Sequence, residues 1–576
     1  MADISKIQIE SGTYDIKDAY LREKAITTFD TVSSMTSSTS LTIDSIVKTL
    51  GFYSANDGGG AYYLIRATGS DTNNGSTLIQ IDDSTSAELI IEKEMNTKQF
   101  GLLGDGETDE TTKLQLFFNQ SIEKYILLSG NYLIDGNIDI NSNSYILFME
   151  NARITRKPTS SGTYFMLNIG NKSNVAIENA HLIGDKNDHT GVDGEWGYGI
   201  HVWASQYITI KNALIEDTWG DGIYVGYSYT LTNSQDPKHI YIDGCKVLNC
   251  SRNGYSICGG EDIIVSNCYS YNTSRTNPKA GLDLEPEAPS GTTPFLKDVI
   301  INNFISNTNG VGIGIAGNNY HMDNIMISNH ISNNETNGFV VWSLGGESTV
   351  VYQNANIIKC YGSGAQITKL KTSSLTLRNV IVDSTRKSNQ THNYDGAIVI
   401  ITSSNDDGNL IIDNVDHVKT YSTLYMYDDL ITERGNGTFD GLIIKNVYTN
   451  LYVCLNNCTN TQIVNSKIYS TSRYYESNVT KNTIMNYWSN ALSLSTNTTR
   501  NFSDNMPDGD YEYILNNNTG GYTFNVVFNS NLTVFNTSSN SSTGRTYGCS
   551  YRSGYLKFKK VGDVIDIIIN NGFTAS

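Results

Sequence analysis

The sequence predicts an all-β chain that folds as a parallel β-solenoid. Three observations lead to this prediction. Short β-rich segments ending in Asn recur along the chain, a second series of short strands opening with Gly follows them, and few helical stretches lie between. Two strand families that share a period describe coils, each of which buries its apolar face only when the next coil stacks on it. At 576 residues the chain is long for one ordinary domain, and a fold that grows in one dimension accommodates that length.

The first series places an Asn at the end of each strand, with spacings of about 19 to 36 residues that vary as loops would. Stacked coils would align these amides into a ladder in which each side chain bonds its neighbour along the axis, so we expect them to be structural rather than catalytic. Gly244, in "IYIDGC", fills one slot of the series. The Asn members are Asn179, Asn212, Asn267, Asn303, Asn329, Asn379, Asn414, Asn446 and Asn465.

The second series sets which side chains face the core. Alternate residues of a strand point to opposite faces, so the apolar positions after each Gly face inward and their alternates face outward. The inward pairs are Ile200/Val202, Ile223/Val225, Tyr255/Ile257, Leu282/Leu284, Ile313/Ile315 and Phe339/Val341. The outward pairs, which we expect on one continuous outer surface, are His201/Trp203, Tyr224/Gly226, Ser256/Cys258, Asp283/Glu285, Gly314/Ala316 and Val340/Trp342.

Composition narrows the function classes. The net charge of −18 argues against nucleic acid and mildly against strongly anionic polymers, but not against a neutral glycan. No apolar run is long enough to span a membrane, and "MADISKIQIE" lacks the features of a secretory signal. The eight Cys show no metal-binding spacing, so we expect reduced, buried thiols.

The segment "MNTKQFGLLGDGETDETTKLQLFFN" (95–119) is a strand, a Gly-Asp-Gly turn and a helix that we expect to be capped near Thr108 and to cover the open end of the solenoid. It resembles the segment that leads into the pectate-lyase-like right-handed β-helices of phage tailspikes. Upstream, 41–65 look like the small head domain that precedes such helices, and the segment 1–30, with "TYDIKDAYLREKA", looks like a virion-attachment arm with a short helix.

The resemblance, which extends from about residue 1 to residue 480, implies an arm at 1–30, a head domain at 31–94 and a right-handed parallel β-helix, which we place at 95–499. The pattern of the remaining residues predicts a separate C-terminal β domain at 500–576. The last part loses the Asn period and alternates like an antiparallel sheet, which suits trimerisation or glycan binding. The resemblance to tailspikes further implies a homotrimer on the virion, attached to the phage tail or baseplate through its N-terminus. Such a protein binds, and often depolymerises, a bacterial cell-surface polysaccharide. The superfamily includes hydrolases, lyases, epimerases and non-catalytic adhesins, so the chemistry must come from the site.

Carboxylates in "AGLDLEPEAP" (280–289) supply candidate chemistry. Asp283 and Glu285 share one strand face about 6.6 Å apart, and Asp221 lies two coils earlier, roughly 9.6 Å away. Glycoside hydrolysis requires a carboxylic acid and a carboxylate, and these separations favour an inverting enzyme with room for water. We expect Glu285 to be the acid and Asp283 or Asp221 the base, because clustered like charges raise the pKa of one member.

Other side chains in the same coils are candidate substrate ligands. Trp203, Tyr224 and Trp342 are stacking platforms for sugar rings, and His201 is a sugar ligand, a base or a packing residue. Arg252 and Lys279 precede neighbouring strands and could orient hydroxyl or anionic groups, while Glu287, beyond Pro286, ranks third among the carboxylates.

Alternatives remain for this row. It could be a solvated acidic edge or a cation site, and the chain could be a non-catalytic adhesin. A lyase would need an acidic uronate, a basic residue for proton abstraction, for which Arg252, Lys279 and Arg275 are candidates, and Ca²⁺ held by the carboxylates. A hydrolase needs no cofactor.

Overall fold

The computed structural model describes residues 26–384 apart from 70–72, 193, 231–234, 319 and 361, together with two strands before residue 26 and shorter pieces beyond residue 384. The chain divides into two compact units, the first formed mainly by residues 1–158 and the second mainly by residues 184–576. Each unit is described by itself.

The first unit contains a small five-stranded sheet followed by the first coils of a parallel solenoid. The sheet runs in the order β3-β4-β5-β7-β6, formed by Thr27–Phe29, Ile46–Thr49, Tyr62–Ala67, Thr85–Leu89 and Leu78–Gln80. Parallel pairing begins with β8, whose partner is β10. The coil strands of this unit are β8 (Glu94–Asn96), β9 (Asp105–Asp109), β10 (Lys124–Leu127), β11 (Gly130–Ile134), β12 (Ser144–Phe148), β13 (Ala152–Arg156), β15 (Ser173–Glu178) and β16 (His181–Ile183).

The predicted helix after the Gly-Asp-Gly turn is present, but its predicted cap is wrong. Helix α3 spans Thr111–Phe118 and its N-cap is Glu110, which makes no side-chain capping bond. Thr108 instead lies in β9 and donates its hydroxyl to Asp105 at 2.8 Å. The Glu110 carboxylate accepts the backbone N–H groups of Leu103 and Gly104, so it closes the preceding turn. In the arm, β1 (Lys6–Ile9) and β2 (Gly12–Asp15) form an antiparallel pair, and the short helix expected after them lies outside the described residues.

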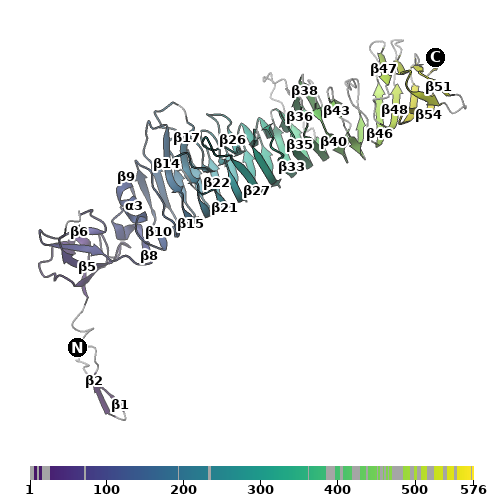
Figure 1. Cartoon of the computed structure of the whole chain (residues 1–576). Helices are drawn as coiled ribbons and strands as arrows, with labels where there is room; N and C mark the ends of the chain where they lie inside the picture. Colours follow the sequence, from purple (N-terminus) through teal and green to yellow (C-terminus); the bar gives the residue numbers. More distant parts are fainter. Residues whose placement is uncertain are drawn as a thin grey trace. The chain divides into compact units, whose positions relative to one another are not determined.

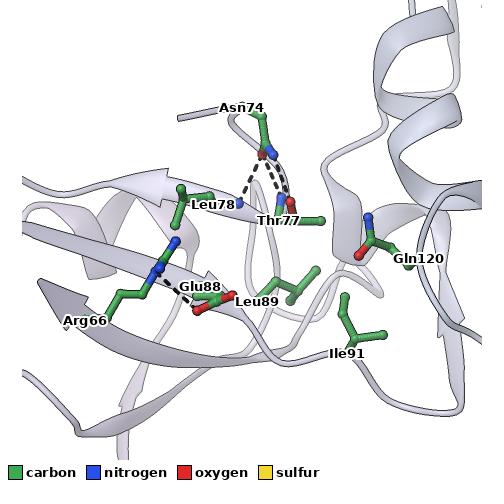
Figure 2. A pocket seen from close by; sticks show the side chains of 8 residues that line it. All are labelled: Arg66, Asn74, Thr77, Leu78, Glu88, Leu89, Ile91 and Gln120. Atoms are coloured by element: carbon green, nitrogen blue, oxygen red, sulfur yellow. Dashed lines mark hydrogen bonds and ion pairs between the residues drawn. The ribbon is translucent and has the colours of Figure 1, made fainter. Parts of the chain in front are cut away.

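The first unit also holds a pocket of about 240 Å³ beside the five-stranded sheet (Figure 2). Arg66 pairs with Glu88 at 3.2 Å, and the Asn74 carbonyl oxygen accepts three backbone N–H groups of its own turn. The polar lining is therefore largely used to hold the loop. The lining residues are Arg66, Asn74, Thr77, Leu78, Glu88, Leu89, Ile91 and Gln120.

The second unit is a solenoid whose coils contribute strands to two long parallel sheets. The first contains β18 (Gln206–Lys211), β19 (Leu214–Glu216), β21 (Lys238–Asp243), β22 (Lys246–Leu248), β24 (Gly260–Ser266), β25 (Tyr269–Tyr271), β27 (Phe295–Asn302), β28 (Ile305–Asn307), β30 (His321–Ser328), β31 (Ile331–Asn333), β33 (Thr349–Cys360), β35 (Ser374–Ser384), β37 (Asn409–His417), β40 (Leu442–Lys445) and β44 (Gln462–Val464).

The second long sheet carries the Gly-led series and runs in chain order without reversal. Strands β17, β26, β36 and β38 follow one another along it in Figure 1. The predicted parallel β-helix is confirmed. The members of this sheet are β14 (Thr163–Gly170), β17 (Trp196–Trp203), β20 (Ile223–Gly226), β23 (Tyr255–Ile257), β26 (Ala280–Leu284), β29 (Val311–Ala316), β32 (Asn337–Ser343), β34 (Ala365–Ile367), β36 (Gly396–Thr402), β38 (Asp429–Gly435) and β42 (Tyr452–Cys454).

The predicted core positions are confirmed. Every inward residue of the Gly-led strands between β17 and β32 is fully buried. Register explains the agreement, because Leu282 lies between Tyr255 and Ile313 and each coil repeats the same alternation. The Cys side chains described by the structure, at positions 245, 250, 258, 268 and 360, are free and buried, as expected.

The Asn ladder is confirmed for part of the series. The Asn303 amide donates to Asn267 at 2.7 Å, and Asn414 donates to Asn379 at 2.9 Å. Other members donate to a different side chain of the neighbouring coil, as Asn267 does to Asp243, Asn379 to Asn354 and Asn446 to Asp413. The described members of the series have positive φ near 55°, a conformation that Asn and Gly adopt more easily than other residues, and Gly244 shares it at 66°. Asn329 bonds Asn302 rather than Asn303, and Asn465 lies outside the described residues.

Toward the C-terminus antiparallel pairing enters. Strand β48 (Asp508–Leu515) pairs parallel with β46 (Ile484–Leu492) and antiparallel with β53 (Gly554–Val561), which pairs antiparallel with β54 (Val564–Asn571). The other strands of this part are β47 (Thr498–Phe502), β49 (Phe524–Phe528), β50 (Thr533–Phe535), β51 (Ser541–Thr543), β52 (Thr546–Cys549) and β55 (Thr574–Ala575). Among the described residues, no helix has the length and hydropathy to cross a membrane.

Candidate functional site: an acidic cluster around Arg252

The outward row of the Gly-led sheet has the predicted register from β20 to β29, but a bulge in the next pair places Ala316 opposite Ser343 rather than Trp342. Tyr224 lies opposite Ser256, Ser256 opposite Asp283, and Asp283 opposite Gly314 on four successive strands. Asp221 and Asn253 occupy the same slot of neighbouring coils, just before the Gly that opens β20 and β23. The sequence therefore stacks Asp221, Ser256 and Asp283 within three coils.

The row is not, however, the exposed outer surface that we expected. Asp221 is 0% exposed and Asp283 is 1% exposed. Tyr198, Tyr224 and Cys258 form an apolar cluster on this face, so the outward side of the sheet has a core of its own. Glu285, just past the end of β26, retains 28% of its side-chain exposure. The carboxylates thus divide into two buried groups and one that reaches the surface.

Arg252 joins the carboxylates. Its Nη1 lies 3.1 Å from Asp221 Oδ2 and its Nη2 lies 3.6 Å from Glu285 Oε2. Its Nε lies 4.0 Å from Glu195, whose side chain is 41% exposed. One guanidinium therefore spans a buried carboxylate and two surface carboxylates, and only 9% of the Arg252 side chain remains exposed. This geometry fixes the guanidinium plane and, through it, the direction of Glu285.

Asn253 and Ser256 complete the network and were missed in the sequence. The Asn253 amide nitrogen donates to Asp283 Oδ2 at 3.2 Å and to Ser256 Oγ at 3.1 Å. The Ser256 hydroxyl donates to Asp221 Oδ2 at 2.8 Å, and the Asn253 backbone N–H donates to Asp221 Oδ1 at 3.0 Å. Both residues are fully buried. The signal was available, because Ser256 precedes Asp283 by one coil in the outward row and Asn253 replaces Asp221 in the slot before Gly.

The electrostatics of the three carboxylates differ. Burial raises the pKa of Asp221, and Arg252, Ser256 and the Asn253 N–H oppose that shift. Burial raises the pKa of Asp283 well above its usual range, the charge of Glu285 raises it further, and Arg252 opposes the shift. Burial and then the charge of Glu287 raise the pKa of Glu285. Asp283 and Glu285 are coupled, so a proton is held by this pair at pH values where an isolated carboxyl would be ionised.

Asp283 Oδ1 is buried and, within the described part of the chain, has no hydrogen-bond partner. It points toward Gly314, where a Cβ would lie 3.4 Å from it. The ring of Trp342 occupies the same notch, 2.4 Å from that Cβ position, and packs against Ala280, Val311 and Val340. Trp342 is therefore held flat against the coil beside Asp283, and it is only partly buried.

The candidate aromatic ligands lie on the other side of the row. His201 stacks on Phe165 at 4.2 Å and on Tyr198 at 5.0 Å, and Tyr198 stacks on Tyr224 at 5.0 Å. Burial lowers the pKa of His201 to about 3, so the imidazole is neutral at physiological pH. Trp203 lies over Gly170, where a Cβ would come within 2.3 Å of its ring. His201 and Trp203 are partly buried, whereas Tyr224 is only 5% exposed and is packed inside the row.

The remaining predicted residues are less central. Glu287 accepts a hydrogen bond from the Tyr229 hydroxyl at 3.3 Å on the rim of the cluster. Lys279 contributes its backbone carbonyl to Thr273 and Gly310, and among the described residues its ammonium forms no ion pair with the carboxylates. Arg275 lies over the Trp219 ring at 4.5 Å. In the described part of the chain, no group of three or more His, Cys, Asp or Glu side chains could hold a metal ion.

This arrangement can hold and orient a proton. A partly exposed carboxyl with a raised pKa, fixed by a buried guanidinium and backed by a second protonatable carboxyl, has the properties of a general acid. Partly buried indole rings at Trp203 and Trp342 lie on opposite sides of it along the row. The site is therefore suited to a ligand with flat apolar faces and a basic oxygen.

No family model matches the chain. The uncharacterized protein YclG of Bacillus subtilis (strain 168) is 29% identical over 268 residues, which are 40% of this chain and 46% of that protein. The SPbeta prophage-derived uncharacterized protein YorA of the same strain is 28% identical over 188 residues, which are 28% of this chain and 32% of that protein. The matched stretch thus spans less than half the length of either curated relative.

Solved structures similar to the chain include tailspikes and another phage protein. The enzymatically active domain of bacteriophage CBA120 tailspike protein 2 covers 74% of this chain and 59% of its own length, at 14% identity and a TM-score of 0.45. Tailspike gp49 of Acinetobacter baumannii bacteriophage Fri1, a capsular polysaccharide depolymerase, covers 95% of this chain and 96% of its own length, at 13% identity and a TM-score of 0.41. An N-terminal fragment of bacteriophage Phi29 gene product 12 covers 69% of this chain and 66% of its own length, at 17% identity and a TM-score of 0.45. Tailspikes, which the segment 95–119 resembles, are therefore among the solved structures similar in fold to this chain.

Proposed function

We propose that the chain is a phage tailspike that binds and depolymerises a bacterial surface polysaccharide by glycoside hydrolysis at Glu285. The observation that carries the proposal is the position of Glu285. It is the one member of the pair with Asp283 that reaches solvent, its pKa is raised, and Arg252 holds it at 3.6 Å. Prophage derivation of a relative and the β-helix fold support the phage assignment.

In this proposal Glu285 protonates the leaving glycosidic oxygen. Asp221 does not contact the substrate, because it is fully buried and already accepts three donors. Asp283 is buried next to Glu285, and the charge of Glu285 raises the pKa of Asp283. Glu287, which is partly exposed, supplies the carboxylate that activates water, and its charge raises the pKa of Glu285 more than any other carboxylate does. Inversion at the anomeric carbon is the proposed outcome, as two carboxyl groups with water between them produce it.

Hydrolysis is favoured over elimination because most of the cationic side chains near the site already have partners. A lyase needs a cation that neutralises the uronate carboxylate and a basic side chain that abstracts a proton. Two of the three candidate cations are engaged, because Arg252 pairs with Asp221 and Glu285 and Arg275 lies over Trp219. Lys279, whose ammonium forms no ion pair with the carboxylates among the described residues, is the one that a lyase would use. The acidic cluster would also repel a uronate. A substrate without carboxylates at the cleaved position fits better.

The test is Glu285→Gln with chain length of host polysaccharide as the readout. We expect loss of chain shortening by 10²-fold or more, because general acid catalysis contributes about 10²–10⁴. Glycan binding and thermal stability should be retained, since the side chain is partly exposed. Glu261→Gln is the matched control and should remain active, because Glu261 is a partly exposed carboxylate that pairs with Lys238 and Lys297 on the other sheet.

A non-catalytic adhesin is the second candidate, and the burial of Asp221 and Asp283 is the observation that favours it. Binding of host polysaccharide by the wild type without new reducing ends would establish the adhesin and end the hydrolase proposal. Products that absorb as unsaturated sugars would instead identify a lyase.

We also propose that the chain acts as a homotrimer on the virion, at the outside of the host cell, with its N-terminus toward the phage tail. An outward apolar row on the first long sheet supports self-association. Ile264, Ile300, Met326 and Val351 lie opposite one another on successive strands, and Ile300 and Met326 are each 39% exposed. Light scattering should give three times 63.5 kDa, and Met326→Asp should lower that mass.

A further inference from the structure

Asn253 occupies the centre of the acidic cluster. It is 0% exposed, and its side chain contacts Ser256, Asp283 and the backbone of Ala280. The Asn253 side chain is a neutral amide, so it contributes no charge to the cluster. Its importance lies in which of its atoms faces each neighbour.

The orientation of the Asn253 amide is dictated by the backbone. The Ala280 N–H donates to Asn253 Oδ1 at 2.9 Å, and a backbone N–H can only donate. The atom facing Ala280 must therefore be the oxygen. The NH₂ group consequently faces Ser256 Oγ and Asp283 Oδ2, and it must donate to both.

This orientation propagates through Ser256. Because Ser256 Oγ accepts from Asn253, its own hydrogen goes to Asp221 Oδ2. Asp221 then accepts three donors, from Ser256, Arg252 and the Asn253 backbone, which favours its ionised form. Asp283 receives one neutral donor on Oδ2 and none on Oδ1, in a fully buried position. The charges that face Asp283 are Glu285, Arg252, Asp221 and Glu287.

We propose that Asn253 is a positioning residue that sets where the cluster keeps its proton, with Asp221 ionised and Asp283 protonated on Oδ1. The proposal deepens the proposed function, because an Asp283 that stays protonated places no negative charge beside Glu285, whose own proton is the one donated to the glycosidic oxygen. It concerns the protein without substrate, so it can fail or hold whether or not the chain cleaves a glycan.

The experiment is a pH titration by infrared spectroscopy of the purified full chain with isotope-labelled aspartate. The wild type should show the carbonyl stretch of a protonated aspartic acid at neutral pH, and Asp283→Asn should abolish it. Absence of the band in the wild type, or its persistence in Asp283→Asn, overturns the proposal.

Asn253→Asp tests the positioning role. The new side chain still accepts from Ala280 and, when ionised, offers only acceptors to Ser256 and Asp283. The midpoint at which the carboxylic band disappears should therefore rise by about one to two pH units. The band of the new carboxyl group itself is identified in the double variant Asn253→Asp/Asp283→Asn. An unchanged midpoint overturns the proposal. Asn309→Asp is the matched control: Asn309 is a buried amide that donates to Glu335 at 2.9 Å, and the Asp283 midpoint should not move.

Ser256→Ala is the second variant, should Asn253→Asp fail to fold. It removes one donor from Asp221 but leaves the amide of Asn253 pinned by Ala280, so the Asp283 band should persist at neutral pH. Its loss would show that Ser256, rather than Asn253, sets the proton position. If the chain degrades polysaccharide, Asn253→Asp should move the pH profile of kcat in the same direction with KM unchanged, which a general loss of structure would not do.

Discussion

Two buried carboxylate networks lie within a few coils of each other in the second unit, and they are stabilised in opposite ways. In the outward network Asp221, which we propose is ionised, lies 3.1 Å from Arg252. In the inward network Glu335, also fully buried, accepts from Ser332 at 2.5 Å, from Ser306 at 3.0 Å and from Asn309 at 2.9 Å, with no cation among these partners.

Their pKa values follow from this difference. Burial raises the pKa of Glu335 to about 8, and the three neutral donors only partly offset it. His330, which bonds Ser306 at 2.8 Å, supplies no charge, since burial lowers its pKa to about 3. The inward carboxyl is thus neutral at neutral pH, whereas in the outward network Arg252 opposes the rise that burial causes in the pKa of Asp221. Neutral hydroxyls and amides suffice to bury an acid, but keeping it charged requires a guanidinium.

The largest expected effect breaks the outward network. Arg252→Met leaves Asp221 buried without its cation, and we expect a loss of about 3–5 kcal/mol in the free energy of unfolding at neutral pH. Chemical denaturation measures it. Arg275→Met, an exposed arginine over Trp219, is the control and should cost only about 0.5–1 kcal/mol. Equal losses for the two variants would mean that Asp221 is neutral in the native protein.

The inward network should respond to pH with a defined sign. The folded pKa of Glu335 lies above its unfolded value, so the native state binds more protons and stability falls as pH rises from about 4.5 to 8, with no further loss from this group above that range. Glu335→Gln mimics the protonated acid. It should match the wild type at acid pH and exceed it by a few kcal/mol at alkaline pH. Thermal unfolding across this range tests it, and parallel pH curves for the two proteins would contradict it.

The sequence predicted those features of the solenoid that recur in every coil. Alternation placed Leu282 and Leu284 inside and Asp283 outside, and the recurring Asn predicted the amide ladder, because both depend on local geometry that every coil repeats. Burial of Asp283 could not be predicted in this way. It depends on how side chains of other coils, among them Trp342 beside Asp283, pack over the row, and the strand period does not encode this tertiary packing.

The smallest expected effect is the loss of stability when one serine hydroxyl is removed from each network. Ser256 donates to Asp221 and Ser332 donates to Glu335, and both are buried. A hydrogen bond to a charged acceptor contributes about 1.5–3 kcal/mol and one to a neutral group about 0.5–1.5 kcal/mol. At neutral pH Ser256→Ala should therefore cost more than Ser332→Ala. Above the pKa of Glu335 the inward acceptor becomes charged, so the cost of Ser332→Ala should grow while that of Ser256→Ala stays constant. Denaturant unfolding of both variants at the two pH values measures these costs, and a Ser332→Ala cost that does not change with pH would show that Glu335 has the same charge throughout the range.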